Sequence, residues 1–372
     1  YHGFKILNMK ITIVAGARPN FMKISPIIRA IENLSTSNKP ISYRLIHTGQ
    51  HYDPNLSDTF FEELQIPHPH KNFNIKSGSQ AEQTAGIMIA FEKELVENRP
   101  DFVMVVGDVT STMSCAIAAK KANISLIHIE AGIRSGDITM PEEINRMVTD
   151  SITDYFFTTS EIANQNLIRS GHLKENIFFV GNVMIDTLLQ NINRIKKPAF
   201  WDDLNLAPKK YYLLTLHRPS NVDEAGSFIE LLNDISAHAG DVPIVFPVHP
   251  RTQQILQETR NEFPNYHFVK PQGYLNFIYL LKNSNAILTD SGGITEEASI
   301  LNIPCITFRN STERPETCSL GTNMLVGNDK IKISEAFQKL KNLKWPNSKT
   351  IPLWDGMASD RIISILLKIH YA

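Results

Sequence analysis

Short β-branched runs alternate with longer helical patterns along almost the whole chain, and no other sequence feature constrains the fold as strongly. Strands are expected at residues 11–14, 43–47, 102–106, 125–129, 155–158, 177–180, 211–216, 244–248, 267–269, 286–289 and 304–307. Most of these runs are followed by a stretch with helical spacing, beginning with residues 19–34. Repeated strand–helix units form parallel sheets with helices on both faces. The sequence therefore predicts an α/β protein.

The rhythm breaks once, at residues 196–201, where two lysines and Pro198 end a helix expected over 186–195. We therefore predict two doubly wound, Rossmann-like domains, over residues 1–196 and 197–357. An amphipathic helix is expected over 358–370, after a loop that contains a proline and a glycine. Doubly wound sheets bind ligands at the carboxyl ends of their strands. We expect a site built from both domains, facing a central cleft.

Composition excludes several classes of function. The 372 residues carry 37 Lys+Arg and 38 Asp+Glu, a formal net charge of −1, whereas a dedicated nucleic-acid binder is usually strongly basic. No apolar run reaches the roughly 18 residues of a membrane span. The cysteines Cys115, Cys305 and Cys318 show neither metal-ligand spacing nor a disulfide framework. We therefore expect a cytoplasmic protein that binds neither nucleic acid nor membrane.

Two strand-to-helix turns are typical of anion sites. The first strand is followed by residues 16–23, where Pro19 suits the first turn of a helix and Arg18 and Lys23 add positive charge. In the second domain, residues 289–294 (TDSGGI) join an apolar strand to a helix that carries Glu296 and Glu297. Glycines there let a diphosphate approach the backbone, and an acidic residue can reach ribose hydroxyls. The alternatives are solvated surface cations in the first turn and a plain turn capped by Ser291 in the second.

Carboxylates follow strands in the first domain. Asp108 and Glu130 come after neighbouring strands of the expected sheet, and Glu142 stands at the start of the next helix. Clustered carboxylates in a partly dry cleft repel one another, which raises pKa values towards those needed for acid–base catalysis. Binding of a divalent metal is a weaker alternative, because the acidic residues have no tight spacing.

Two histidines follow strands in the second domain, each next to an arginine. His217-Arg218 and His249-Pro250-Arg251 indicate recognition of an anionic ligand or proton transfer to it. Residues 312–316 (TERPE) follow a further strand and are expected to close over a nucleotide.

These segments together closely resemble the non-hydrolysing UDP-N-acetylglucosamine 2-epimerases. The matching stretches occur in family order across most of the chain: GARPNFMK (16–23), TGQHYD (48–53), VGDVTST (106–112), HIEAGIRSGD (128–137), MPEEINR (140–146), TLHRPSN (215–221), FPVHPR (246–251), TDSGGITEEA (289–298) and TERPE (312–316).

The resemblance implies a GT-B fold in which the last helix, residues 358–372, packs on the first domain, usually in a homodimer. It also implies a reaction without metal or cofactor that interconverts UDP-N-acetylglucosamine and UDP-N-acetylmannosamine by eliminating UDP and adding it back. The catalytic positions of the family match Asp108, Glu130, Glu142 and His217. The substrate-binding positions are expected at Arg18, Lys23, Gln50, His51, Arg146, His249, Ser291, Gly292, Gly293, Glu297 and Arg314.

Several alternatives share the fold or the ligand. A hydrolysing epimerase would release free N-acetylmannosamine, and another epimerase would act on a related sugar such as a diacetamido-uronic acid nucleotide. A GT-B glycosyltransferase would also bind a UDP-sugar but needs an acceptor, and a non-catalytic sensor would not need clustered acids. One departure from the family is Pro219-Ser220-Asn221, where many members carry a further arginine and glutamate. From it we expect no strong activation by a second substrate molecule.

Overall fold

The computed structural model describes residues 8–34, 40–49, 61–75, 78–222, 225–248, 252, 256 and 263–371. The chain divides into two compact units, which we call unit 1 (Tyr1–Gln190 with Pro352–Ala372) and unit 2 (Asn191–Ile351). The division falls a few residues before the Lys196–Trp201 segment at which the sequence predicts a boundary. No helix in the described residues is both long enough and apolar enough to cross a membrane.

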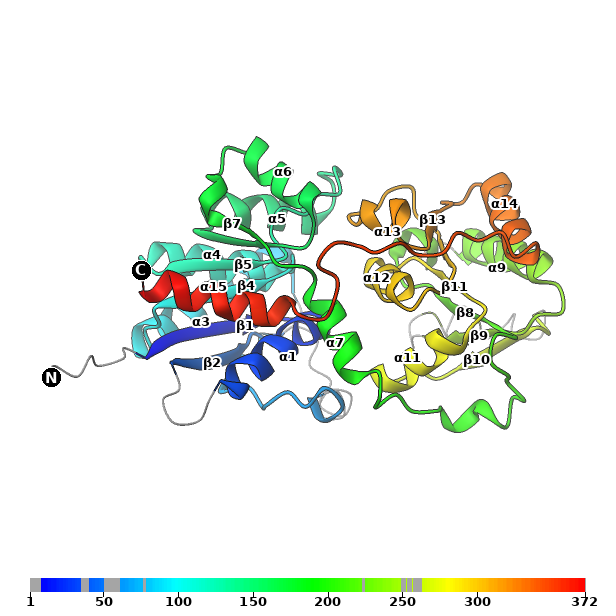
Figure 1. Ribbon diagram of the computed structural model, residues 1–372, viewed down its shortest axis with the longest axis horizontal. Coiled ribbons are helices and arrows are strands. Elements are labelled where there is room, and N and C mark those ends of the chain that lie inside the picture. Colours follow the sequence, from blue (N-terminus) through cyan, green and yellow to red (C-terminus); the bar gives the residue numbers. More distant parts are fainter. Residues whose placement is uncertain are drawn as a thin grey trace, which may run out of the picture. The chain divides into compact units, whose positions relative to one another are not determined.

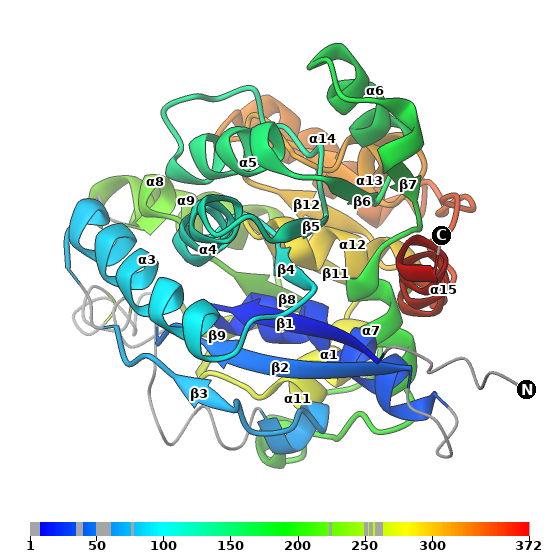
Figure 2. The same ribbon diagram turned by 90° about the vertical axis from the view of Figure 1, so that its left-hand side faces the viewer.

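Unit 1 is built on a seven-stranded parallel sheet with the strand order β3-β2-β1-β4-β5-β6-β7. The strands are β1 (Met9–Ala15), β2 (Ile41–His47), β3 (Lys71–Asn72), β4 (Phe102–Val106), β5 (Ser125–Ile129), β6 (Tyr155–Thr158) and β7 (Ile177–Phe179). The helices are α1 (Arg18–Asn33), α3 (Gln80–Glu97), α4 (Thr110–Lys121), α5 (Pro141–Ile152), α6 (Glu161–Arg169), α7 (Val183–Asn191) and α15 (Ala358–Tyr371). Helices α3, α4 and α5 cover one face of this sheet, and α1 and α15 cover the other (Figures 1 and 2).

Unit 2 has a six-stranded parallel sheet with the order β10-β9-β8-β11-β12-β13. Its strands are β8 (Tyr212–Thr215), β9 (Ile244–Pro247), β10 (Tyr266–Val269), β11 (Ala286–Thr289), β12 (Cys305–Thr307) and β13 (Asn323–Leu325). Its helices are α8 (Pro219–Val222), α9 (Ala225–Ala239), α11 (Tyr274–Asn283), α12 (Gly292–Ile300), α13 (Pro315–Ser319) and α14 (Lys330–Lys341). Apolar residues of β8, β9, α9 and α14 make up much of its core.

Both sheets reverse their strand order at one point, which lies between β1 and β4 in unit 1 and between β8 and β11 in unit 2. Such a switch point leaves a crevice outside the carboxyl ends of the strands, where open α/β sheets bind ligands. Ligand-binding residues are therefore expected directly after β1 and β4 in unit 1, and directly after β8 and β11 in unit 2.

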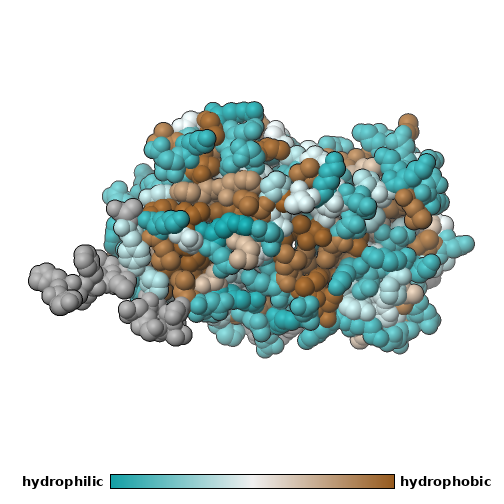
Figure 3. Space-filling model, in the orientation of Figure 1, coloured by the Kyte–Doolittle hydropathy of each residue, from teal (hydrophilic) through white to brown (hydrophobic). Residues whose placement is uncertain are grey.

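Helix α15 joins unit 1 although it comes from the far end of the chain. It packs against α1, and the buried Asp186 of α7 accepts hydrogen bonds at the first turn of α15, from the backbone N–H groups of Ala358 (3.1 Å) and Ser359 (2.7 Å). The Trp354 indole N–H, just before α15, donates to the Thr159 carbonyl at 3.0 Å. Hydrophilic residues lie along the exposed side of α15 with apolar residues beside them (Figure 3).

All eleven expected strands are present, and most of their ends agree within one or two residues. Two short edge strands, β3 and β13, were not predicted. The helix expected over 186–195 ends earlier, at Asn191. There the Asn191 carbonyl accepts the Arg194 N–H at 2.8 Å, and the Asn191 side chain accepts from the Arg194 guanidinium at 2.7 Å. These local bonds close a turn that competes with the helix.

Candidate active site

The two strand-end carboxylates of unit 1 lie at the same edge of its sheet. Strands β4 and β5 pair in register up to Val106 and Ile129, so Asp108 and Glu130 both follow the last paired residues. Glu130 is buried, with 4% of its surface exposed, and its backbone is in the left-handed region (φ 67°). A non-glycine residue seldom adopts this conformation, and such residues concentrate at functional sites.

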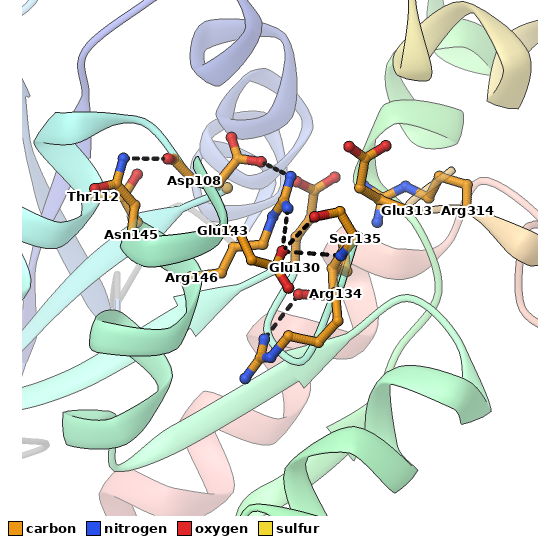
Figure 4. A network of polar contacts seen from close by, with 12 residues as sticks. Asp108, Thr112, Glu130, Arg134, Ser135, Glu143, Asn145, Arg146, Glu313 and Arg314 are labelled. Carbon is orange, nitrogen blue, oxygen red and sulfur yellow. Dashed lines mark hydrogen bonds and ion pairs between the residues drawn. The ribbon is translucent and has the colours of Figure 1, made fainter. Parts of the chain in front are cut away.

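Each of these carboxylates is held by a cation. Lys23 of α1 forms an ion pair with Glu130. Arg146 of α5 donates to Asp108 at 2.5 Å and, through its other terminal nitrogen, to Glu143 at 2.7 Å (Figure 4). The sequence predicts repulsion between clustered carboxylates, and the structure places a cation against each of these two.

The turn that carries Asp108 requires a glycine before it. Gly107 has a φ of 67°, and a Cβ atom there would meet the Lys23 amine at 3.0 Å and a Glu130 carboxylate oxygen at 3.6 Å. A side chain at this position would therefore be strained and would crowd the Lys23–Glu130 pair. The Asn145 side chain fixes the turn further by donating to the Asp108 carbonyl at 2.8 Å.

The two adjacent glutamates at the start of α5 have different environments. Glu142, the predicted catalytic residue, is exposed. Glu143 is buried and accepts hydrogen bonds from the Ser135 N–H (2.9 Å), the Ser135 hydroxyl (3.0 Å) and the Gly136 N–H (3.2 Å). Burial alone would raise the pKa of Glu143, but these bonds and Arg146 outweigh it and lower the pKa. Glu143 therefore acts as a fixed anion that holds Arg146.

A buried network centred on His128 also supports the turn at Gly107. One ring nitrogen of His128 lies 2.7 Å from the Asp150 carboxylate and the other lies 2.8 Å from the Gly107 carbonyl. Asp150 also accepts from Arg134 (2.6 Å) and from the Gly132 N–H (3.1 Å). Burial would raise the pKa of Asp150, but His128 and Arg134 outweigh it and lower the pKa.

The turn after β1 is braced by a residue that the sequence did not single out. The side-chain oxygen of Asn20, Oδ1, accepts from the N–H groups of Gly16 and Ala17, both at 3.1 Å, and its side-chain Nδ2 donates to the Val106 carbonyl at 3.1 Å. Arg18 is exposed at the first residue of α1. The turn is thus fixed to β4, with a cation at the helix N-terminus where anions bind.

In unit 2, the turn between β11 and α12 is the predicted diphosphate site. The Ser291 side chain makes no capping hydrogen bond, so the alternative of a turn capped by Ser291 is not what the structure shows. A Cβ atom on Gly293 would meet nothing within 4 Å, and one on Gly292 would make only ordinary contacts. The packing therefore does not require glycine at either position, and the open space beside Gly293 suits a ligand that approaches the backbone closely.

The predicted nucleotide-binding residues Glu297 and Arg314 are both buried. Arg314 forms an ion pair with Glu296. Glu297 accepts a hydrogen bond from the Tyr274 hydroxyl at 2.9 Å. Burial raises the pKa of Glu297 to about 8; the Tyr274 bond opposes this rise and the charge of Glu296 adds to it.

The raised pKa of Glu297 predicts a pH effect on stability. Unfolded, this carboxyl loses its proton near pH 4.5; folded, it keeps the proton until about pH 8. Because the folded state binds more protons between these values, this group lowers stability as pH rises, by roughly 1.4 kcal/mol per pH unit. In Glu297→Gln that contribution is absent. Thermal melting across this pH range should show the variant gaining stability relative to the wild type as pH rises, and parallel curves would count against the raised pKa.

Three predicted residues, Gln50, His51 and His249, lie outside the described residues, as does Arg251. His217, which follows β8, lies 2.8 Å from the Asp290 carboxylate through its Nδ1 atom. In the described ranges, no three His, Cys, Asp or Glu side chains are grouped so that they could hold a metal ion.

Sequence reasoning missed several residues that hold the predicted ones in place, namely Asn20, His128, Arg134, Glu143, Asn145, Asp150 and Asp290. Most of them stand in or beside the motifs that were singled out. His128 is two residues before Glu130, and Asp290 directly precedes Ser291. A polar residue inside an otherwise apolar strand, as at His128, is a signal that could have been used, because a buried polar group needs a partner.

The chain is similar to known proteins along nearly its whole length. Residues 34–367 match the family described as UDP-N-acetylglucosamine 2-epimerase. A UDP-N-acetylglucosamine 2-epimerase of Methanocaldococcus jannaschii is 43% identical, covering 96% of this chain and 99% of that protein. A UDP-2,3-diacetamido-2,3-dideoxy-D-glucuronate 2-epimerase of Pseudomonas aeruginosa is 36% identical, covering 97% of this chain and 100% of that protein.

Solved structures give the same result. A crystal structure of the M. jannaschii UDP-GlcNAc 2-epimerase in complex with UDP-GlcNAc and UDP has a TM-score of 0.85 and 42% identity, covering 97% of this chain and 100% of the other. The expected α/β class with two Rossmann-like domains is confirmed. The match along nearly the whole chain, and not only at the motifs, shows that the chain belongs to the UDP-N-acetylglucosamine 2-epimerase family.

Proposed function

We propose that this protein interconverts UDP-N-acetylglucosamine and UDP-N-acetylmannosamine by inverting the configuration at C2 of the sugar, without hydrolysing the nucleotide. The observation that carries the proposal is the pair of carboxylates, Asp108 and Glu130, that follow neighbouring strands and are each held by a cation. Membership in the family and the M. jannaschii structure with bound UDP-GlcNAc and UDP support the choice of substrate.

The chemistry needs a base for a weakly acidic proton and a stabilised leaving group. One carboxylate removes the C2 proton while the C1–O bond breaks, and the electron pair of that bond leaves with UDP. UDP then adds back to the resulting 2-acetamidoglucal after a proton reaches C2 from the other face. We assign the proton transfers to Asp108, Glu130 and Glu142, since positioned acids and bases contribute about 10²–10⁴-fold to such steps.

The departing diphosphate needs donors and cations. We assign the binding of the diphosphate to Arg18 at the N-terminus of α1 and to Ser291, Gly292 and Gly293 at the β11–α12 turn. The first backbone N–H groups of a helix have no partner within the helix, so they can donate to an anion. The open space beside Gly293 supports this assignment.

The remaining assignments of the site follow the family motifs. His217 contacts the leaving group, and Glu297 contacts the ribose. Lys23 and Arg146 act beside the carboxylates that they hold. We also assign substrate binding to Arg314, Gln50, His51 and His249. For the last three, the assignment depends on the sequence motifs alone.

The reaction of the pure protein with UDP-N-acetylglucosamine in deuterated water tests the proposal. Proton NMR should show UDP-N-acetylmannosamine appearing with deuterium at C2, because the removed proton exchanges with solvent. Free N-acetylmannosamine with UDP would indicate the hydrolysing reaction instead. The P. aeruginosa relative supports one second candidate. No turnover of UDP-N-acetylglucosamine, but turnover of a UDP-diacetamido-uronic acid, would establish that substrate.

We also propose a homodimer that uses exposed apolar residues of two helices of unit 1, α3 and α5. Ile89 and Val96 of α3 are 57% and 81% exposed, and Ile144 and Met147 of α5 are each 49% exposed. Helix α4 contacts both α3 and α5, and the three helices lie side by side (Figure 2). Exposed apolar surface of this kind is typical of a protein–protein interface.

The double substitution Ile89→Glu with Val96→Glu is therefore expected to produce monomers, because burying two carboxylates in an apolar interface is costly. Light scattering after gel filtration should give twice the chain mass for the wild type and the single-chain mass for the variant. Ile331→Glu, at a 72% exposed apolar residue of α14, serves as the matched control and should remain dimeric. A dimeric double variant would exclude this face as the interface.

A cytoplasmic location completes the proposal. Its support is the cysteine content, since Cys115, Cys305 and Cys318 are all free thiols in the structure and the first two are buried. Unpaired cysteines are normal in a reducing compartment, where disulfides are rare.

A further inference from the structure

Asp290 and His217 are neighbours because the strands that precede them are paired. Thr215 of β8 and Thr289 of β11 are partners in the parallel register, and their hydroxyls lie 2.7 Å apart. The residues that leave these strands at the carboxyl edge are therefore held next to each other. Asp290 is fully buried, whereas the His217 side chain is 57% exposed.

Four donor groups converge on the Asp290 carboxylate. They are the backbone N–H of His217 (3.1 Å to the nearer oxygen), the N–H of Arg218 (2.9 Å), the side-chain amide of Asn221 (3.0 Å) and Nδ1 of His217 (2.8 Å). Burial alone would raise the pKa of Asp290, but its partners, led by His217, outweigh burial and lower it. An ionised carboxylate only accepts hydrogen bonds, so the proton between Asp290 and His217 is carried by Nδ1.

We infer that Asp290 is a positioning residue that fixes the orientation and tautomer of His217, so that Nε2 is the ring nitrogen presented to the substrate. The inference deepens the proposed function and rests on it for the role of His217. A neutral imidazole carries its proton on either nitrogen, and the partner of one nitrogen sets the state of the other.

Asn221 holds Asp290 in turn. Its amide group donates both to Asp290 and to the Phe308 carbonyl at 3.3 Å, which ties the residues after β8 to the end of β12. Asp290 itself is not placed to react with a substrate. It is enclosed, and its oxygen atoms are occupied by these donors.

NMR of the wild-type protein with ¹⁵N-labelled histidine tests the tautomer directly. The signals of His217 are identified by their loss in His217→Gln. We expect Nδ1 of His217 to carry a proton and to show a slowly exchanging N–H signal, as an N–H bonded to a buried carboxylate does. A neutral ring with its proton on Nε2 would overturn the inference. This measurement uses the unliganded protein, so it stands whether or not UDP-N-acetylglucosamine is turned over.

Kinetics test whether Asp290 acts through His217. We expect Asp290→Asn to lower kcat by at least about 100-fold, as removal of an orienting carboxylate does elsewhere. In a protein that already carries His217→Gln, Asp290→Asn should lower kcat by less than about a further threefold. The effects of substituting two residues that act as a unit are not additive. Asp241→Asn, at an exposed residue of the same unit, is the matched control and should keep the wild-type kcat.

Equal losses from Asp290→Asn in both backgrounds would overturn the inference, since they would mean that Asp290 acts without His217. Circular dichroism establishes first that the variants are folded. If Asp290→Asn does not fold, the wild-type NMR result alone decides. Absence of any wild-type turnover would instead refute the proposed function and leave the His217–Asp290 pair to the NMR test.

Discussion

Asp108→Asn and Glu130→Gln are each expected to lower turnover by at least about 100-fold while the protein stays folded, because each removes a proton-transfer group and keeps the shape of the side chain. The neutral amides can still accept hydrogen bonds from Arg146 and Lys23, their partners in the wild type. The same loss is expected for Glu142→Gln. Initial rates of UDP-N-acetylmannosamine formation measure the effect.

Deuterium exchange at C2 separates the two carboxylates. The variant that lacks the base for a given epimer should lose exchange from that epimer more than from the other. Glu175→Gln, at an exposed residue of unit 1, is the matched control. Turnover close to that of the wild type in any one variant, with unchanged melting, would remove that residue from the catalytic set.

Arg146→Met is expected to destabilise the protein by about 3 kcal/mol, because it leaves the carboxylates of Asp108 and Glu143 without the cation between them. Arg146 is 6% exposed and Glu143 is 2% exposed, so water replaces little of the lost interaction. Turnover should fall as well, since Asp108 would no longer be oriented. Urea unfolding followed by circular dichroism measures the change in free energy.

Two further variants identify the cause. Arg146→Lys keeps the charge but carries it on a single nitrogen, whereas Arg146 contacts Asp108 and Glu143 through two different nitrogens, so the stability of this variant should lie between those of Arg146→Met and the wild type. Adding Glu143→Gln to Arg146→Met should restore part of the loss, because the buried charge is then gone. An unfolding free energy of Arg146→Met equal to that of the wild type would show that the bridge contributes nothing.

How far the sequence predicted the site depends on where each residue stands in its element. Asp108 and Glu130 could be placed together because they end consecutive strands, and the pairing of parallel strands brings their carboxyl ends to one edge. That Glu142 is exposed and Glu143 buried could not be predicted. Adjacent helix residues point about 100° apart, and the phase of α5 depends on how it packs on the sheet.

Contacts between segments that are distant in the chain could not be predicted from the sequence either. His128 and Asp150 are 22 residues apart and meet only because α5 lies over β5. The edge strands β3 (KN) and β13 (NML) escaped prediction because they contain no β-branched residue, unlike β7 (IFF) and β12 (CIT), which are equally short or nearly so. Such short strands depend on a neighbour that is already formed, and they carry too few side chains for an alternating pattern.

The position of α15 sets an order of events during synthesis. Unit 2 is one continuous stretch of chain, whereas unit 1 is completed only by residues after Ile351. At about 5 to 20 residues per second, the ribosome takes roughly 10 to 30 seconds to pass through unit 2. Throughout that time α1 lacks the helix that packs against it, and Asp186 lacks the backbone N–H groups that it binds in the finished protein. The first unit to leave the ribosome is therefore the last to be complete, and the face of α1 that α15 covers in the finished protein stays uncovered while the chain is still growing.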